Sequence, residues 1–384
     1  DQKNKKNTVE QKGGATFRFT NNYDFNTYDY KKQKQSIHLF LPTLGYNPDD
    51  GIKIGPAYVF TFNGFQRNPF SQQHRIGAGY YFATNSFDIN YEGEFANIFG
   101  SWNFLLGGYY KNPNFSENYF GFGNETLNPH YEFDFEKDYN RVRIGGYGGS
   151  IGVKKVSPFG STFIFKALFE GIEVEGTDGR YITQVTPTPV ALDETKYFVS
   201  AEGTYQYESY DNKVNPTRGM NFNLVAGGTQ NIDDSDRIFG YVKPQIVFYN
   251  ALTRNRKLVL KTDVRGQFNI GNNFEFYQGA QLGSDTGLRA YRDERFTGRT
   301  AAVAGADLRY SFNKFKTALL PIQLGVFGGY DVGRVWVPND TSDKLHSSYG
   351  GGLWVNTADL LSGTFNLFAG DEGLRFTFGL AFSM

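Results

Sequence analysis

The chain has 384 residues, with 39 Lys and Arg against 39 Asp and Glu, so its formal net charge at pH 7 is zero. Zero net charge disfavours a nucleic-acid partner, which requires a basic surface, and the absence of cysteine excludes disulfide scaffolds, zinc–thiolate sites and cysteine nucleophiles. No stretch approaches the roughly 20 consecutive apolar residues of a membrane helix. Aromatic residues make up 17% of the chain and glycine contributes 46 residues, a mixture typical of many strands joined by tight turns. A β-barrel is compatible with the mean hydropathy of −0.48, because strands of alternating polarity look hydrophilic on average.

Residues 1–36 are polar and too few for an independent domain. We predict a periplasmic lead-in or plug segment here, with one extra strand between Gly14 and Phe25. The opening stretch lacks the apolar segment of a signal peptide, so we expect the chain to be a mature or truncated product.

Residues 37–384 are predicted to form a single barrel. They contain about sixteen segments in which polarity alternates with a period of two, and no helical periodicity of useful length. These strands are predicted to begin near Ile37, Ile52, His74, Ser86, Gly100, Asp138, Thr162, Lys196, Gly219, Arg237, Lys257, Thr300, Leu319, Ser347, Leu361 and Leu374.

The segment from Leu258 to Ile270 shows the alternation most clearly. One of its faces is mainly apolar, and the other carries Lys261, Asp263 and Arg265. Full charges recur on the polar face strand after strand, which a water-filled lumen allows and the core of a sandwich forbids. We therefore favour a transmembrane barrel over the alternative, a soluble β-sandwich or propeller.

The connections between strands alternate in length. Short turns such as SPFGS near Ser157 follow even-numbered strands, and long gaps follow several odd-numbered strands, namely Lys111 to Lys137, Gly176 to Thr195 and Gly271 to Arg299. This asymmetry is typical of outer-membrane barrels. The sequence therefore predicts an all-β fold, a sixteen-stranded antiparallel transmembrane β-barrel with long extracellular loops, short periplasmic turns and both termini in the periplasm.

Motifs of catalysis and metal binding are weak or missing. The GGSIG segment at Gly148 matches G-x-S-x-G, but it lies within a predicted strand and no helix follows it. The histidines lack metal-ligand spacing, and there is no P-loop or dinucleotide fingerprint. We expect no metal site, no cofactor and no enzymatic activity in this chain.

Four segments resemble motifs of the BamA/TamA-type outer-membrane assembly superfamily, the bacterial surface antigen type of Gram-negative bacteria. NPTRGM at Asn215 is similar to its N-P-x-x-G periplasmic turn, and GYNPDDG at Gly45 resembles its first hairpin. GGYDVGRVW resembles its F-x-D-x-G strand motif through Tyr330, Asp331 and Gly333. The V-R-G-[FY] tip of its sixth extracellular loop is matched by Leu288, Arg289, Ala290 and Tyr291.

The chain also departs from that superfamily. Ala290 stands where glycine is usual, so a positive φ there would be strained, and Met384 replaces a C-terminal aromatic residue. Residues 1–36 contain no POTRA repeat. ENYFGFGNET at Glu117 resembles barrels that follow a calcineurin-like metallophosphoesterase domain, whose own motifs are absent here. The resemblance implies the barrel half of such a fusion protein.

The gap from Gly271 to Arg299 is predicted to fold into the lumen rather than to form a solvated tip. By alternation, Asp307 and Asp331 face the lumen from the next two strands. We predict that Arg289 pairs with Asp331, that Asp307 is a second acceptor, and that Tyr291 packs against the lumen wall. The alternative is an exposed Arg289 at a mobile loop tip.

The seam between the first and last strands is predicted to be weak. The strand from Ile37 to Tyr46 alternates poorly and contains Pro42, which cannot donate a ladder hydrogen bond. The alternative is that Pro42 merely lies near the periplasmic end of the strand or at a bulge. A weak seam would let an incoming strand pair with an exposed edge.

The resemblance implies a function in inserting or translocating polypeptide at the outer membrane. The implied partners are a polypeptide substrate or the protein's own N-terminal hydrolase domain, together with outer-membrane lipid and lipopolysaccharide. The competing function is a passive channel or small-molecule transporter, in which lumen charges such as Lys261 set selectivity.

Overall fold

The computed structural model describes residues 13–14, 35–47, 49–63, 70–130, 136, 138–186, 188–271, 273–318, 320–357 and 361–382. Most of the predicted lead-in, residues 1–36, lies outside these residues, as does Met384. No helix in the described part of the chain is long and apolar enough to cross a membrane.

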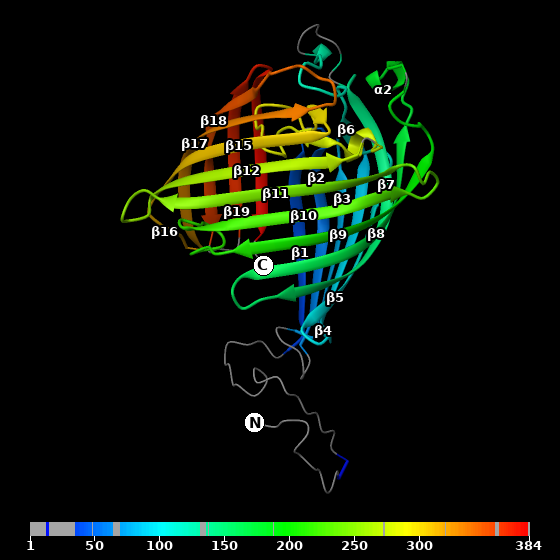
Figure 1. Cartoon of the computed structure of the whole chain (residues 1–384). Coiled ribbons are helices and arrows are strands. Elements are labelled where there is room, and N and C mark those ends of the chain that lie inside the picture. Colours follow the sequence, from blue (N-terminus) through cyan, green and yellow to red (C-terminus); the bar gives the residue numbers. More distant parts are fainter. Residues whose placement is uncertain are drawn as a thin grey trace.

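Sixteen long strands form the barrel wall within the described residues (Figure 1). Each begins within three residues of its predicted start, so the predicted all-β barrel fold is confirmed. The wall strands are β1 (Ile37–Asn47), β2 (Gly51–Phe62), β3 (Gln72–Tyr81), β4 (Ser86–Phe99), β5 (Trp102–Lys111), β7 (Arg141–Val156), β8 (Ser161–Glu175), β9 (Thr195–Glu208), β10 (Gly219–Asn231), β11 (Ile238–Ala251), β12 (Leu258–Ile270), β15 (Thr300–Ser311), β17 (Pro321–Trp336), β18 (His346–Thr357), β19 (Leu361–Gly370) and β20 (Gly373–Phe382).

Short elements lie in the connections. They are β6 (Ser116–Asn118), α2 (Tyr181–Gln184), η2 (Phe276–Gln278), β13 (Ala280–Leu282), β14 (Phe296–Gly298) and β16 (Phe315–Lys316). The GGSIG segment lies inside β7, as its strand interpretation predicts.

Every wall strand pairs antiparallel with the next wall strand along the chain, from β1 with β2 to β19 with β20. The remaining junction is the seam between β1 and β20, whose Cα atoms come within 8 Å of each other. No ladder pairing joins these two strands in the residues that the structure covers. The barrel is therefore nearly closed.

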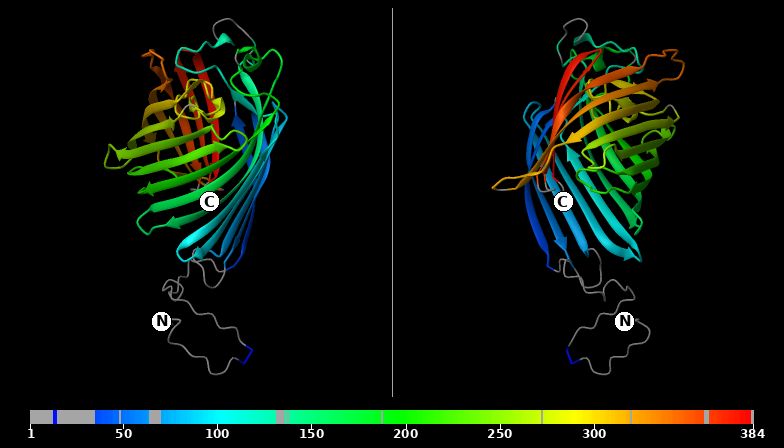
Figure 2. Two further views of the ribbon diagram at one scale, coloured as in Figure 1. Left: turned by 45° about the vertical axis from the view of Figure 1, so that its right-hand side comes forward. Right: turned by 90° about the vertical axis from the view of Figure 1, so that its left-hand side faces the viewer.

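The antiparallel order puts the long connections at one end of the barrel, here called the loop end, and the short turns at the other, the turn end (Figures 1 and 2). Connections 112–140, 176–194 and 271–299 all lie at the loop end. Since β1 starts and β20 finishes at the turn end, the first and last wall strands run in opposite directions along the seam.

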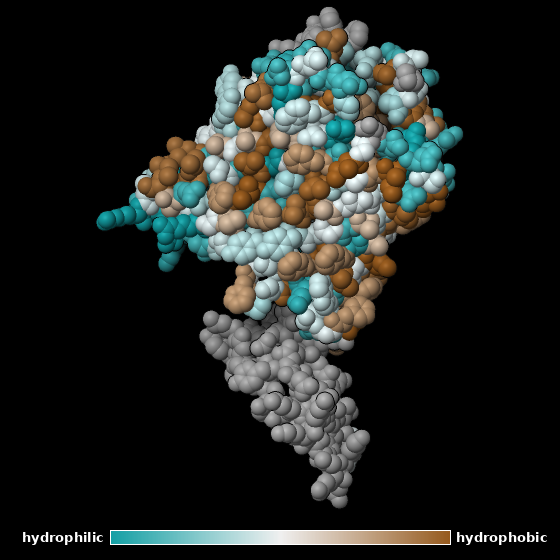
Figure 3. Space-filling view, in the orientation of Figure 1, coloured by the Kyte–Doolittle hydropathy of each residue, from teal (hydrophilic) through white to brown (hydrophobic). Residues whose placement is uncertain are grey.

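The outer surface of the wall is apolar and the inner surface is polar. On β20, Leu374 is 68% exposed and Phe376 54% exposed. Inside, charged side chains of different strands pair with each other, as Lys154 of β7 does with Glu94 of β4 at 2.9 Å, across the intervening β5. The space-filling view shows apolar side chains spread over the wall (Figure 3). Many exposed apolar side chains outside and charged side chains inside are the inverse of a soluble barrel, and this arrangement fits lipid outside and water inside.

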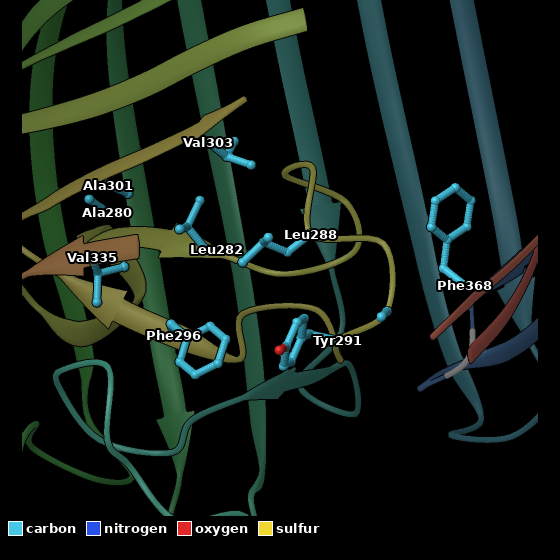
Figure 4. Packing of buried hydrophobic residues seen from close by; sticks show 10 residues of the cluster. Ala280, Leu282, Leu288, Tyr291, Phe296, Ala301, Val303, Val335 and Phe368 are labelled. Carbon is cyan, nitrogen blue, oxygen red and sulfur yellow. The ribbon is translucent and has the colours of Figure 1, made fainter. Parts of the chain in front are cut away.

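The largest buried cluster lies inside the barrel, where the connection 271–299 meets the wall (Figure 4). We call this connection the inward loop. The cluster consists of Ala280, Leu282, Leu288, Ala290, Tyr291, Phe296, Ala301, Val303, Val335 and Phe368.

Candidate functional site

The apolar residues at the tip of the inward loop are buried. Leu288 is 0% exposed and Tyr291 is 1% exposed. The Tyr291 ring packs against Phe296 of the same loop at 5.2 Å between centroids, and against His346 of β18 at 5.7 Å. The loop thus carries its own small apolar core, which it buries against the barrel wall (Figure 4).

Arg289 reaches from this tip to two strands of the wall. Its Nε and Nη2 atoms donate to the two carboxylate oxygens of Asp331 at 2.9 and 2.6 Å, and Nη2 also donates to Asp307 at 2.6 Å. The guanidinium lies over the Phe368 ring at 4.0 Å. Burial disfavours the charge, yet the hydrogen bonds to both carboxylates outweigh burial and raise the pKa of Arg289. The planar fork of arginine explains this geometry, because one side chain satisfies two acceptors.

The strand motif provides the main acceptor of this guanidinium, Asp331. Tyr330 points outward and is 52% exposed, whereas Asp331 points into the lumen and is 2% exposed. A Cβ atom on Gly333 would lie 2.8 Å from the Ala302 carbonyl oxygen, so glycine permits the close approach of β15. The role of Tyr330, Asp331 and Gly333 in function stays a prediction, while their places in the wall are clear.

Gly329 is a residue of the site that the sequence argument missed. A Cβ atom there would lie 2.2 Å from an Asp307 carboxylate oxygen and 2.7 Å from Arg289 Nη2. Only glycine leaves room for the ion pair at this position. The period of two could have identified Gly329, because Gly329, Asp331 and Gly333 share the inward face of β17.

Ala290 occupies its place in the tip without strain. The positive φ values of the tip belong to Gly287 at 120° and Glu294 at 52°, and Ala290 is not among the residues with positive φ. Its N–H group donates to Ser348 Oγ at 3.1 Å. A Cβ atom on Gly370 would lie 2.9 Å from the Ala290 Cβ, so the glycine of β19 makes room for the alanine of the loop.

Two further arginines of the inward loop, Arg292 and Arg295, also form ion pairs. Their acidic partners lie in hairpins, so the alternation of polarity along the strands could not predict them. Arg292 Nη2 lies 3.2 Å from Asp49 in the β1–β2 hairpin. Arg295 Nε lies 2.5 Å from Glu372 in the β19–β20 hairpin, and its Nη1 donates to Thr126 Oγ1 at 2.7 Å. Their signal in the sequence was the acidic residue at each hairpin tip.

Pro42 lies in the middle of β1, in an unbroken register, opposite Pro56 of β2. The alternative that places it at the strand end or at a bulge is therefore wrong. Two prolines cannot form a hydrogen-bonded antiparallel pair, because neither has an N–H group. The backbone nitrogen of Pro42 must point away from β2 and toward the seam, where it removes a donor from the free edge of β1.

Of two polar cavities inside the barrel, only the smaller one touches the inward loop. A cavity of about 680 Å³ runs along β3, β4, β5, β7 and β8, with Arg75, Glu92 and Lys166 among its lining residues. A smaller cavity of about 130 Å³ lies under the loop tip and includes Lys261, Asp263 and Arg265. Across the residues that the structure describes, no three or more acidic or histidine side chains are placed to hold a metal ion.

These features define an antiparallel β-barrel with an apolar exterior, an unpaired seam and a lumen occupied by one of its own loops. Barrels of known structure share this fold. BamA from Haemophilus ducreyi lacking POTRA domains 1–3 superposes with a TM-score of 0.64 at 14% identity, over 91% of this chain and 70% of that one.

Two CdiB structures are also similar. CdiB from Escherichia coli gives a TM-score of 0.56 at 10% identity, and CdiB from Acinetobacter baumannii gives 0.53 at 12% identity. The chain spans 63% and 60% of their lengths, less than two thirds in each case. No protein-family model and no curated protein sequence matches the chain.

Proposed function

We propose that this chain is an integral barrel of the bacterial outer membrane that inserts or translocates polypeptide. The observation that carries the proposal is the unpaired seam between β1 and β20, beside a lumen occupied by the inward loop. The fold shared with BamA and CdiB supports the same conclusion, as do the motifs around Arg289 and Asp331.

The chemistry of the seam suits a polypeptide as substrate. The free edge of β1 presents backbone N–H and C=O groups that another extended chain can pair with. Pro42 interrupts the donors of this edge, which keeps its pairing with β20 weak. The substrate's own folding and the burial of its apolar face in lipid would supply the free energy, so no nucleotide is required.

Orientation and partners follow from the two ends of the barrel. With the loop end facing outward, the start of β1 and the finish of β20 both lie on the periplasmic side. The apolar exterior contacts phospholipid and lipopolysaccharide. The chain's own role is non-catalytic. The substrate class includes a hydrolase domain fused before the barrel, which the segment at Glu117 suggests.

Reconstitution tests the proposal directly. Liposomes containing the purified chain should speed the insertion of a urea-unfolded eight-stranded outer-membrane barrel, measured as the heat-sensitive band on a gel. A disulfide joining Phe40→Cys to Phe378→Cys, in the part of the seam nearer the turn end, should abolish this increase in insertion rate, and reduction should restore it. Equal rates with crosslinked and reduced protein would refute insertion through the seam.

The cavity of about 680 Å³ favours the second candidate function, a passive channel. In planar bilayers, a channel would give stable open steps that persist without polypeptide. A chain whose lumen is blocked by the inward loop should be mostly closed. Persistent conductance together with no gain in insertion would establish the channel instead.

A further inference from the structure

The two hairpins that border the seam both contact the inward loop. At the loop end, β1 turns into β2 through Asp49 and Asp50, and β19 turns into β20 through Asp371 and Glu372. These two tips belong to opposite sides of the seam. Arg292 binds Asp49 on one side, and Arg295 binds Glu372 on the other.

A third contact reaches the seam strand itself. Asp293 lies between the two arginines in sequence, and its carboxylate is 3.6 Å from the Arg375 guanidinium of β20. Four consecutive residues, 292–295, therefore supply three charged contacts, one to the first hairpin and two to the last hairpin and strand. We call Arg292, Asp293 and Arg295 the clasp.

The clasp is buried and cross-braced. The side chains of Arg292 and Arg295 are 9% and 4% exposed, and those of Asp49 and Glu372 are 3% and 13% exposed. Asp49 is also held by Arg141 of β7 at 2.9 Å, and Glu372 also accepts from Asn128 at 2.9 Å. Water competes poorly for charges placed in this way, so the loop sets the spacing of both hairpins.

We propose that the clasp fixes the seam at its loop end, so that β1 and β20 separate from the turn end. The wall strands at the turn end are joined to their neighbours by short turns, and no side chain of the inward loop bridges the seam there among the described residues. A seam fixed at one end opens as a wedge. An incoming strand would then begin to pair at the turn end and advance toward the clasp.

This inference concerns the same seam as the proposed function, but its first test needs no substrate. The chain has no cysteine, so paired spin labels can be introduced without removing native thiols. One pair, Tyr46→Cys with Leu374→Cys, reports the loop end, and a second pair, Phe40→Cys with Phe378→Cys, reports a part of the seam nearer the turn end. Pulsed electron resonance in detergent should give a narrow distance distribution for the first pair and a broad one for the second.

The double variant Arg292→Gln/Arg295→Gln should broaden the loop-end distance distribution until it is at least as wide as that of the Phe40→Cys and Phe378→Cys pair. Arg237→Gln is the matched control, because it removes a 2.6 Å contact to Glu275 of the same loop, away from the seam. That variant should leave the loop-end distribution narrow. An unchanged loop-end distribution in the double variant, or a narrow second distribution in the unmodified chain, would overturn the proposal.

Three further variants cover the case in which the double variant does not fold. Glu372→Gln removes one carboxylate from a hairpin tip and should broaden the loop-end distribution alone. Arg295→Glu should also broaden the loop-end distance distribution. Adding Glu372→Arg to that variant exchanges the two charges and should narrow the distribution again, which would not be expected if Arg295 acted only through its packing. If these responses occur while insertion fails, the proposed function falls and the clasp stands. Insertion without these responses overturns the clasp alone.

Discussion

At the scale of single residues, the site depends on how one guanidinium is shared between two strands. Arg289 satisfies Asp331 and Asp307 together, and Gly329 leaves the room. Arg289→Lys keeps the charge and removes the fork, so we expect the loop tip to lose roughly 1–3 kcal/mol of docking free energy. Hydrogen exchange of residues 283–296 should rise accordingly, with the melting temperature of the barrel little changed. Lys154→Arg serves as a control, because its contact with Glu94 lies away from the loop. Unaltered exchange in Arg289→Lys would contradict the prediction.

The pH response of the inward loop is a second property of this scale. Burial raises the pKa of Asp293 to about 6, against the opposing charge of Arg375. Between about pH 4 and 6, Asp293 therefore holds a proton in the docked loop, whereas an ordinary aspartate in an undocked loop has lost it. This contribution to docking is present at pH 5 and is lost as the pH rises through 6.

Exchange protection of residues 283–296, corrected for the intrinsic rate, should accordingly be greater at pH 5 than at pH 7. Asp293→Asn should reduce the difference. Burial also raises the pKa of Asp285, so part of the response should remain. A variant that keeps the full pH response would show that Asp293 is not its source.

At the scale of elements, β1 is the strand whose edge sets the strength of the seam. Pro42→Ala returns an N–H donor to that edge, and we expect β1 and β20 to pair more tightly. The distance distribution between Phe40→Cys and Phe378→Cys labels should narrow, and polypeptide insertion should slow. Pro56→Ala is the matched control, because its nitrogen points away from the seam on the other side of the pair. Equal effects of the two substitutions would remove the special role of Pro42.

Alternation predicted the strands well because each wall strand separates lipid from water along its whole length. Asp307 and Asp331 could be placed in the lumen by the same rule. Partners that lie in loops could not be predicted. The contacts of Arg292 with Asp49 and of Arg295 with Glu372 depend on where three separate connections meet, and a period of two carries no information about that meeting. The prediction that the 271–299 loop folds inward depended on its tip, where apolar residues and arginines lie side by side in the sequence.

At the scale of the whole molecule, the apolar exterior decides the behaviour in solution. Side chains such as Leu374 and Phe376 would be exposed to water without lipid or detergent. The purified chain should therefore require detergent, should give a β-type circular dichroism spectrum in it, and should migrate faster on gels before heating than after. A monodisperse chain in plain buffer would contradict the membrane assignment.

The order of ladders along the chain also sets an order of folding. Each hairpin can form from residues close in sequence, at small cost in chain entropy. The contact between Arg292 and Asp49 is different, since it joins residues 243 positions apart. It must wait until the first hairpin and the inward loop stand in place, and Arg295 must wait for Glu372, close to the end of the chain. A barrel that lacks its last hairpin would leave Arg295 without this carboxylate, and the inward loop would lose one of its contacts with the wall. Docking of the inward loop therefore depends on whether the first and the last hairpin of the wall have both formed.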